Sequence, residues 1–324
     1  MKENWERTKP LYKLHKREIE EMLQFFMPKE GLESAQLLGG GFSNLNYKLQ
    51  VESFKKPFVL RISNEKNCKL ENSLHGKLYK QMPVPEIHYS KYQGDQSFSI
   101  MEWKEGIQLK ELMYGNDVRA IRQSAFSVGC WLSEMRKIKF KESGFFNEDV
   151  EVSDPLKITP DTYLSLMKEF LIDGHVSRWL GKETTNELWD LTRRNNYFLK
   201  DIDEVPALVH SDYNGLNILV SEYKRNSKVT GIIDWEFAFS GPVYFDIGNM
   251  LRYENIPYFS EFENAFIEGL KSGGIILHHD WKKISKLVDL IALGSLLNHS
   301  YVGENRVKDI KQLVTQTIKN WDDY

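Results

Sequence analysis

The stretch from residue 207 to residue 234 constrains the fold more than any other part of the chain. It contains short apolar runs at 207–209, 218–220 and 229–233. His210, Asp212 and Asn217 lie between the first two runs, and Asp234 directly follows the third. Short apolar runs between turn residues are typical of buried strands. The stretch therefore predicts a hairpin-like set of strands with polar side chains at their ends, which indicates a functional site.

The residue types at these strand ends are the ones that phosphoryl transfer requires. During transfer the phosphoryl group carries negative charge on its oxygens, so Mg²⁺ must lie against it. Mg²⁺ prefers carboxylate and amide oxygens as ligands. Asn217 and Asp234 supply such oxygens. The attacking hydroxyl needs a carboxylate that accepts its proton, and Asp212 is the candidate. A simpler interpretation stays open, in which Asp212 and Asn217 only cap turns.

The remaining pattern predicts an α+β fold with a small antiparallel sheet first and helices afterwards. Strand patterns recur from residue 34 to residue 103, and one helix interrupts them over residues 66–81. After Gly106 the apolar spacing changes to steps of three and four, which is typical of helices that bury one face. We expect helices at 118–135, 160–172, 184–200, 259–271, 281–298 and 306–320. The pattern predicts two units, 1–103 with a leading helix and 104–324, joined near 104–109.

The segments LVHSDYNGLNILV (208–220) and GIIDWEFAFSGPVYFDIGNM (231–250) resemble the motifs of the aminoglycoside phosphotransferase family. In that family the first motif usually reads H-G-D-x-x-x-x-N, and the second reads I-D-W-E followed by a further Asp, here Asp246. The resemblance implies a two-lobed, protein-kinase-like fold with a nucleotide-binding first lobe. It also implies a kinase that uses Mg²⁺ and either ATP or GTP to phosphorylate a hydroxyl of a small molecule.

The same resemblance implies a role for each motif residue. Asp212 would be the catalytic base, Asn217 and Asp234 would hold magnesium, and His210 and Asp246 would support the catalytic loop. Ser211 stands where the family normally has Gly, which adds a hydroxyl beside the base.

Residues that would bind the nucleotide lie in the first unit. The glycines at 39–41, with Ser43, fit a turn that covers phosphates, although a plain hairpin turn fits them as well. In the strand FVLRIS, Arg61 stands where kinases carry a Lys, and its expected partner is Glu71 on the next helix. Arg keeps the positive charge and grips phosphate as a fork. An exposed helix carboxylate is the alternative interpretation of Glu71.

By the same resemblance, the segment 99–109 forms the hinge between the lobes, where the backbone of Glu102, Trp103 and Lys104 would contact a purine. The sequence does not separate ATP from GTP.

The acceptor is less well defined by the sequence. No A-P-E motif follows Asp234, so a protein substrate is disfavoured. Acidic and aromatic residues of the second unit suit a small, cationic, hydroxylated acceptor such as an aminoglycoside. We expect them to include Glu236, Tyr253, Glu254 and Trp281. The alternative is that these residues are solvated acids and core aromatics. The neighbouring residues 278–280 (His-His-Asp) fit a surface turn better than a metal site.

Composition excludes several other classes of protein. The formal net charge is −3 with basic residues spread along the chain, so nucleic acid is not an expected partner. The longest apolar stretch has eleven residues and contains Asp289, so no membrane span is expected. Two cysteines at no metal or redox spacing favour the cytoplasm. The oligomeric state is not legible. The main rival to a kinase is a nucleotide-binding regulatory pseudokinase, for which Arg61 and Ser211 are the support.

Overall fold

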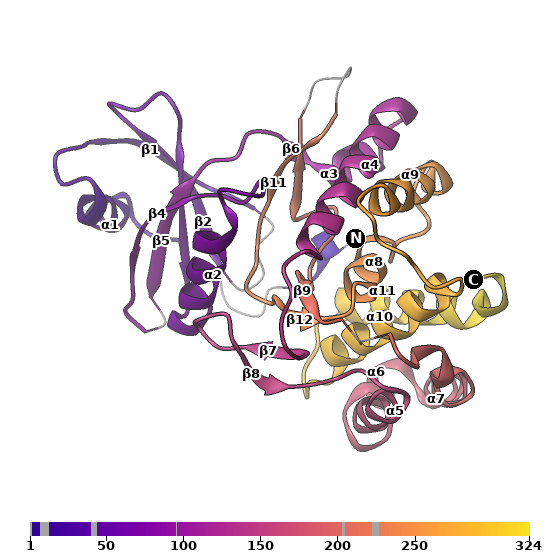
Figure 1. Ribbon diagram of the computed structural model, residues 1–324. Coiled ribbons are helices and arrows are strands. Elements are labelled where there is room, and N and C mark those ends of the chain that lie inside the picture. The colour runs from indigo at the N-terminus through magenta and orange to yellow at the C-terminus, as the bar shows by residue number, and fades with distance from the viewer. Residues whose placement is uncertain (1, 7–12, 40–43, 95, 203–204, 222–226) are drawn as a thin grey trace.

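The computed structural model consists of a five-stranded antiparallel sheet and a larger helical part (Figure 1). The strand order in the sheet is β1-β2-β3-β5-β4. The structure describes residues 2–6, 13–39, 44–94, 96–202, 205–221 and 227–324. The elements of the first part are α1 Lys16–Phe26, β1 Leu32–Leu37, β2 Leu45–Val51, β3 Phe58–Ser63, α2 Glu65–Leu78, β4 Ile87–Lys91 and β5 Ser97–Glu102. The expected α+β class is confirmed.

Alternation along the strands builds the core of this sheet. In β2 the side chains of Tyr47, Leu49 and Val51 are buried, while their neighbours are only partly covered. Helix α1 closes this side with Ile19 and Leu23, which are buried in the same apolar cluster. The leading helix therefore completes the core of the sheet.

Helix α2 packs the other way, into the larger core. It begins at Glu65 after Asn64, whose side chain accepts a hydrogen bond from the backbone of Asn67 at 2.9 Å. Leu70, Leu74 and Leu78 belong to the same apolar cluster as the helices of the second part. The helix ends earlier than expected because the chain turns before the proline at 83. The division at residues 103–104 stays a prediction, and α2, which precedes it, is buried in the apolar cluster of the second part.

The second part is mainly helical. Its helices are α3 Leu109–Met113, α4 Val118–Met135, α5 Pro160–Lys168, α6 Val176–Leu180, α7 Lys182–Asn195, α8 Tyr244–Met250, α9 Phe259–Ser272, α10 Trp281–Leu297 and α11 Glu304–Lys319. Its strands are β6 Ile107–Gln108, β7 Gly144–Phe146, β8 Val152–Pro155, β9 Ala207–Val209, β10 Ile218–Val220, β11 Val229–Ile232 and β12 Phe239–Gly241. Short 3-10 or π turns are η1 Lys2–Asn4, η2 Glu169–Asp173, η3 Asn196–Leu199 and η4 Trp321–Asp323.

Two small sheets fix the polar stretch identified in the sequence. Strand β10 pairs antiparallel with β11 and with β6, and β9 pairs with β12. The loop from His210 to Asn217 is therefore held at both ends by strands. The expected joint at 104–109 is more than a linker, because it contributes β6 to one of these sheets.

The first residues of the chain pack against the helical second part and not against the sheet that follows them in the sequence. Figure 1 shows the short indigo turn η1 among the orange and yellow helices of the second part. Trp5 is buried in the larger core and η1 contacts α11. Among the described residues, no helix has the length and apolar content needed to cross a lipid bilayer.

Candidate active site

One carboxylate, that of Asp246, binds the backbone of the loop after β9. Asp246, fully buried in α8, accepts hydrogen bonds from the backbone N–H groups of His210 and Ser211, both at 2.9 Å. Ser211 has φ 69°, in the left-handed region that favours glycine. Burial raises the pKa of Asp246 to about 7, and the two N–H donors act in the opposite direction. These bonds set the direction in which the next side chain, Asp212, leaves the loop.

Asp212 has partners on both carboxylate oxygens. Oδ2 accepts a hydrogen bond from Nδ2 of Asn217 at 2.8 Å, and Oδ1 accepts one from Nδ2 of Asn214 at 2.8 Å. Oδ1 also forms an ion pair with the ammonium of Lys2. Burial acts to raise the pKa of Asp212, but Lys2, together with weaker contributions such as that of Arg252, outweighs it, so this pKa lies below its usual value. The carboxylate is held rigidly and is ionised at neutral pH.

His210 lies beneath this loop as a neutral imidazole. Its Nδ1 accepts the backbone N–H of Asp212 at 3.2 Å, so the proton resides on Nε2, which lies 3.1 Å from the carbonyl oxygen of Ile233. Burial lowers the pKa of His210. The imidazole thus connects the loop that carries Asp212 to the segment that carries Asp234.

Asn217 and Asp234 are brought together by the β10–β11 hairpin. The backbone N–H of Ile233 donates to the carbonyl of Asn217 at 3.0 Å. Because Nδ2 of Asn217 donates to Asp212, its amide oxygen is the atom it can offer to a cation. The Asp234 side chain is 27% exposed and turns at φ 70°. An amide oxygen and an accessible carboxylate at the same end of this hairpin fit Mg²⁺, which takes oxygen ligands.

Arg61 connects this pair to helix α2. Its Nη2 donates to Oδ1 of Asp234 at 2.5 Å, and its Nε forms an ion pair with Oε2 of Glu71 at 2.7 Å. Oε1 of Glu71 lies 3.3 Å from the backbone nitrogen of Trp235, which donates to it. Burial lowers the pKa of a guanidinium, but Glu71 and Asp234 outweigh it and raise the pKa of Arg61. Glu71 is 3% exposed, which excludes the exposed-carboxylate interpretation.

In the segment expected to form the hinge, one backbone group already has a partner. The backbone N–H of Glu102 donates to the carbonyl of Glu86 at 2.8 Å, so this group is already used within the first part. The Glu102 carboxylate pairs with Lys104 at 2.7 Å. Lys48 places its ammonium 4.2 Å from the ring centroid of Trp103. Ser43 and the glycines at 40–41 lie outside the described residues.

The four expected acceptor residues do not form one group. Glu236 accepts a hydrogen bond from Nδ2 of Asn67 in α2 at 2.7 Å, and so belongs with Arg61 and Asp234 rather than with the helical part. Its polarity had suggested a substrate contact, but a partner in α2 explains its burial. Glu254 and Trp281 do line one cavity, of about 220 Å³, beside α8, α9 and α10.

Tyr253 and Glu254 are both held by nearby side chains. Tyr253 donates to Oδ2 of Asp309 at 2.6 Å. Glu254 accepts hydrogen bonds from Gln316 at 3.0 Å and from Tyr324 at 3.1 Å, and it pairs with Lys286. These bonds fix one wall of the cavity.

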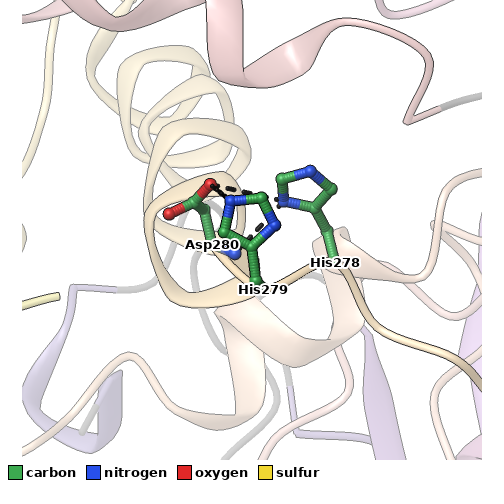
Figure 2. A group of neighbouring side chains, drawn as sticks. All are labelled: His278, His279 and Asp280. Carbon is green, nitrogen blue, oxygen red and sulfur yellow. Dashed lines mark hydrogen bonds and ion pairs between the residues drawn. The ribbon is translucent and has the colours of Figure 1, made fainter.

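The His278–Asp280 segment forms the surface turn before α10. Figure 2 shows the Asp280 carboxylate beside both imidazoles, 2.7 Å from Nε2 of His279 and 3.5 Å from Nδ1 of His278. The His279 side chain is 81% exposed. The backbone N–H of Asp280 donates to Nδ1 of His278 at 3.1 Å, so this nitrogen already serves the turn.

Sequence reasoning missed two side chains that touch Asp212. Asn214 lies inside the motif, and its type could have suggested a contact with Asp212 two residues before it. Lys2 is 210 positions away from Asp212, and nothing in the local pattern around it indicates that contact.

Comparisons with known proteins identify a family and related folds. The model of the phosphotransferase enzyme family, APH, matches residues 34–285. The crystal structure of aminoglycoside phosphotransferase APH(4)-Ia is 17% identical, with a TM-score of 0.67, and the match covers 94% of this chain and 99% of that chain. No curated protein matches the sequence.

Two further solved structures share the fold. A GDP and kanamycin complex of APH(2")-IIIa is 18% identical with a TM-score of 0.68, and the match covers 94% of this chain and 98% of that one. A GDP complex of an aminoglycoside 2'-phosphotransferase-IIIa variant is 17% identical with a TM-score of 0.71, covering 95% and 99%. The kinase-like fold expected from the sequence is therefore confirmed. With the family model matching most of its length, the chain belongs to the phosphotransferase enzyme family.

Proposed function

We propose that the protein is a magnesium-dependent kinase that transfers the γ-phosphate of ATP or GTP to a hydroxyl of a small, cationic acceptor such as an aminoglycoside. The observation that carries this proposal is the convergence of Asp212, Asn217 and Asp234, joined by hydrogen bonds through a shared hairpin. Kanamycin and hygromycin B are bound in solved structures that share the fold, which supports this class of acceptor.

The residues divide the reaction between them. Asp212, oriented by Asn214 and Asn217, accepts the proton of the acceptor hydroxyl as its oxygen bonds to phosphorus and the nucleoside diphosphate leaves. Asn217 and Asp234 would hold Mg²⁺, which neutralises the charge on the phosphate oxygens when it is bound. Arg61 holds Asp234 in place and adds positive charge near the nucleotide.

The test separates proton transfer from metal binding. Asp212→Ala should lower kcat by about 10²- to 10⁴-fold while the Kd for Mg·nucleotide changes little. Asp234→Ala should raise that Kd, because a metal ligand is lost. Asp154→Ala, which removes an exposed carboxylate on β8, is the matched control and should change neither. Unchanged turnover in the Asp212 variant would reject its role as the base. A panel of kanamycin, hygromycin B, choline, homoserine and sugar amines identifies the acceptor.

A pseudokinase is the second candidate, because Arg61 and Ser211 depart from the family pattern. It predicts Mg·nucleotide binding without phosphate transfer to any acceptor. The Arg61–Glu71 pair argues against it, since the arginine makes with α2 the ion pair that an active kinase makes with lysine. Slow magnesium-dependent nucleotide hydrolysis in the absence of an acceptor would favour the enzyme.

A further inference from the structure

The segment Lys2–Glu6, here called the N-terminal strap, is docked on the helical part of the molecule. Trp5 is 7% exposed, and its Nε1 donates to Oδ2 of Asp309 in α11 at 2.9 Å. The guanidinium of Arg306 lies 5.1 Å from the Trp5 ring centroid. An indole that is both buried and hydrogen-bonded is a strong anchor. The strap is therefore a specific contact of the fold.

Glu6 fixes the other end of the strap. Its carboxylate accepts the backbone N–H of Asn305 at 2.8 Å and that of Arg306 at 3.3 Å. These residues form the first turn of α11, whose N–H groups have no partner within the helix. The anion also lies at the positive end of the helix dipole. Trp5 and Glu6 together determine where Lys2 points.

Lys2 extends from this anchor to the proposed base. Its ammonium pairs with Oδ1 of Asp212, and the two side chains are only 12% and 17% exposed. Asn214 and Asn217 hold the same carboxylate. An acceptor hydroxyl has to reach Asp212 to lose its proton, so it must approach the position that Lys2 occupies. An ammonium donates hydrogen bonds and cannot take up that proton.

We propose that the N-terminal strap is an internal competitor of the acceptor: Lys2 occupies the place on Asp212 that the acceptor hydroxyl must take, and transfer requires the strap to leave. This inference rests on the proposed function, because it assumes that Asp212 receives the acceptor. Charge supports it, since the same carboxylate that pairs with Lys2 suits an acceptor that carries amines. The strap thus acts as a pseudosubstrate within the chain.

Competition predicts a specific kinetic signature. When only a fraction of molecules has the strap undocked, the apparent KM for the acceptor rises by the inverse of that fraction. Lys2→Met should therefore lower the KM for the acceptor by about 3- to 10-fold, if the strap is docked in roughly 70–90% of molecules, and leave kcat unchanged. Trp5→Ala and Glu6→Ala, which remove the anchor without touching Asp212, should do the same. Lys13→Met, which removes an exposed lysine, is the matched control.

A second measurement does not depend on turnover. Acetylation of the Lys2 ammonium by acetic anhydride, followed by mass spectrometry, should be about 3- to 10-fold slower than acetylation of exposed Lys13 if docking holds Lys2 in its ion pair in the same fraction of molecules. Glu6→Ala should remove most of this protection, and kanamycin should reduce it if it displaces the strap. Equal rates at Lys2 and Lys13 in the unmodified protein would overturn the proposal.

The two measurements separate the possible failures. If Lys2 is protected and Glu6→Ala releases it, yet no acceptor is phosphorylated, the proposed function fails while the docked strap stands. If acceptors are phosphorylated and Lys2→Met leaves their KM unchanged, the competition fails while the function stands. A fall in kcat in Lys2→Met would also overturn the competition, because Lys2 would then assist transfer.

Discussion

Ser211 carries backbone strain at the centre of the proposed site. Its φ of 69° lets its N–H reach Asp246 and its carbonyl accept a hydrogen bond from Asn249 at 3.2 Å. A side chain in this region costs about 1–2 kcal/mol, and replacing it by Gly costs about 0.5–1 kcal/mol in chain entropy. We predict that Ser211→Gly raises the free energy of unfolding by roughly 0.5–1 kcal/mol, measured by urea denaturation.

The control for this prediction is Ser295→Gly in α10, where the same change lies in ordinary helical backbone. It should lower the free energy of unfolding by about 0.5 kcal/mol, because Gly is a poor helix former. A destabilised Ser211→Gly variant would mean that the hydroxyl stabilises the loop more than the strain opposes it.

His75 in α2 makes stability depend on pH. Burial lowers its pKa to about 3, and its Nδ1 lies 2.8 Å from the carbonyl oxygen of Pro85. The unfolded chain takes up a proton near pH 6.5 and the folded chain does not, so this contribution is complete above pH 6.5 and is lost as the pH falls toward 3. Between pH 7 and pH 5 the free energy of unfolding should fall by roughly 2 kcal/mol through this residue.

His75→Asn should weaken this pH dependence. Asn keeps a donor toward Pro85 and does not titrate, so the variant should lose less stability than the unmodified protein between pH 7 and pH 5. The comparison is made by urea unfolding at both pH values. His279→Asn, on the surface turn, should retain the full dependence, and an unaltered slope in His75→Asn would show that other groups cause it.

At this scale the sequence predicts residues inside motifs better than residues that reach the site from elsewhere. Arg61 and Glu71 were paired from their places on a strand and the next helix, and their side chains do form an ion pair. The contact of Glu236 with Asn67 was not foreseen, because the two residues lie 169 positions apart in the sequence. Lys2 escaped prediction for the same reason.

Helices α4 and α9 pack through their glycines. A Cβ on Gly129 would collide with the carbonyl oxygen of Phe266, and a Cβ on Gly269 would collide with that of Phe126. The backbones therefore approach closely, as small residues allow. We predict that Gly129→Ala lowers the free energy of unfolding by about 1–3 kcal/mol or more, because the helices must separate. Thermal and urea denaturation measure this change.

Gly76→Ala is the matched control. Gly76 is exposed in α2, and no atom lies within 4 Å of a Cβ built on it. This variant should gain about 0.5–1 kcal/mol, since Ala is the better helix former. If Gly129→Ala behaved like Gly76→Ala, the close packing of α4 on α9 would be refuted.

The longer elements were predictable because each carries its own periodic pattern. The helices at 118–135 and 281–298 and the strand FVLRIS appear within a residue or two of their expected bounds. Strands β6, β7, β8 and β12 were not expected. They are two to four residues long, and β6, β7 and β12 pair with strands distant in the sequence, as β6 does with β10, while β8 pairs only with neighbouring β7. No local periodicity can indicate such strands.

At the scale of the molecule, ligand binding should tie the two parts together. The proposed nucleotide contacts come from β3 and α2 on one side and from the β10–β11 hairpin on the other. Mg·ATP or Mg·GTP at one hundred times its Kd should stabilise the fold by about 2.7 kcal/mol. Differential scanning fluorimetry measures the shift, which Asp234→Ala should diminish. The absence of a shift with either nucleotide would contradict a nucleotide site.

Asp309 has a consequence for how such chains diverge. Its Oδ2 atom accepts two hydrogen bonds, one from Trp5 and one from Tyr253. Three distant stretches of sequence therefore meet at a single atom. Loss of that acid would leave the indole N–H of Trp5 and the hydroxyl of Tyr253 without this hydrogen-bond acceptor at the same time. We therefore expect positions 5, 253 and 309 to change together, rather than singly, as sequences related to this protein diverge.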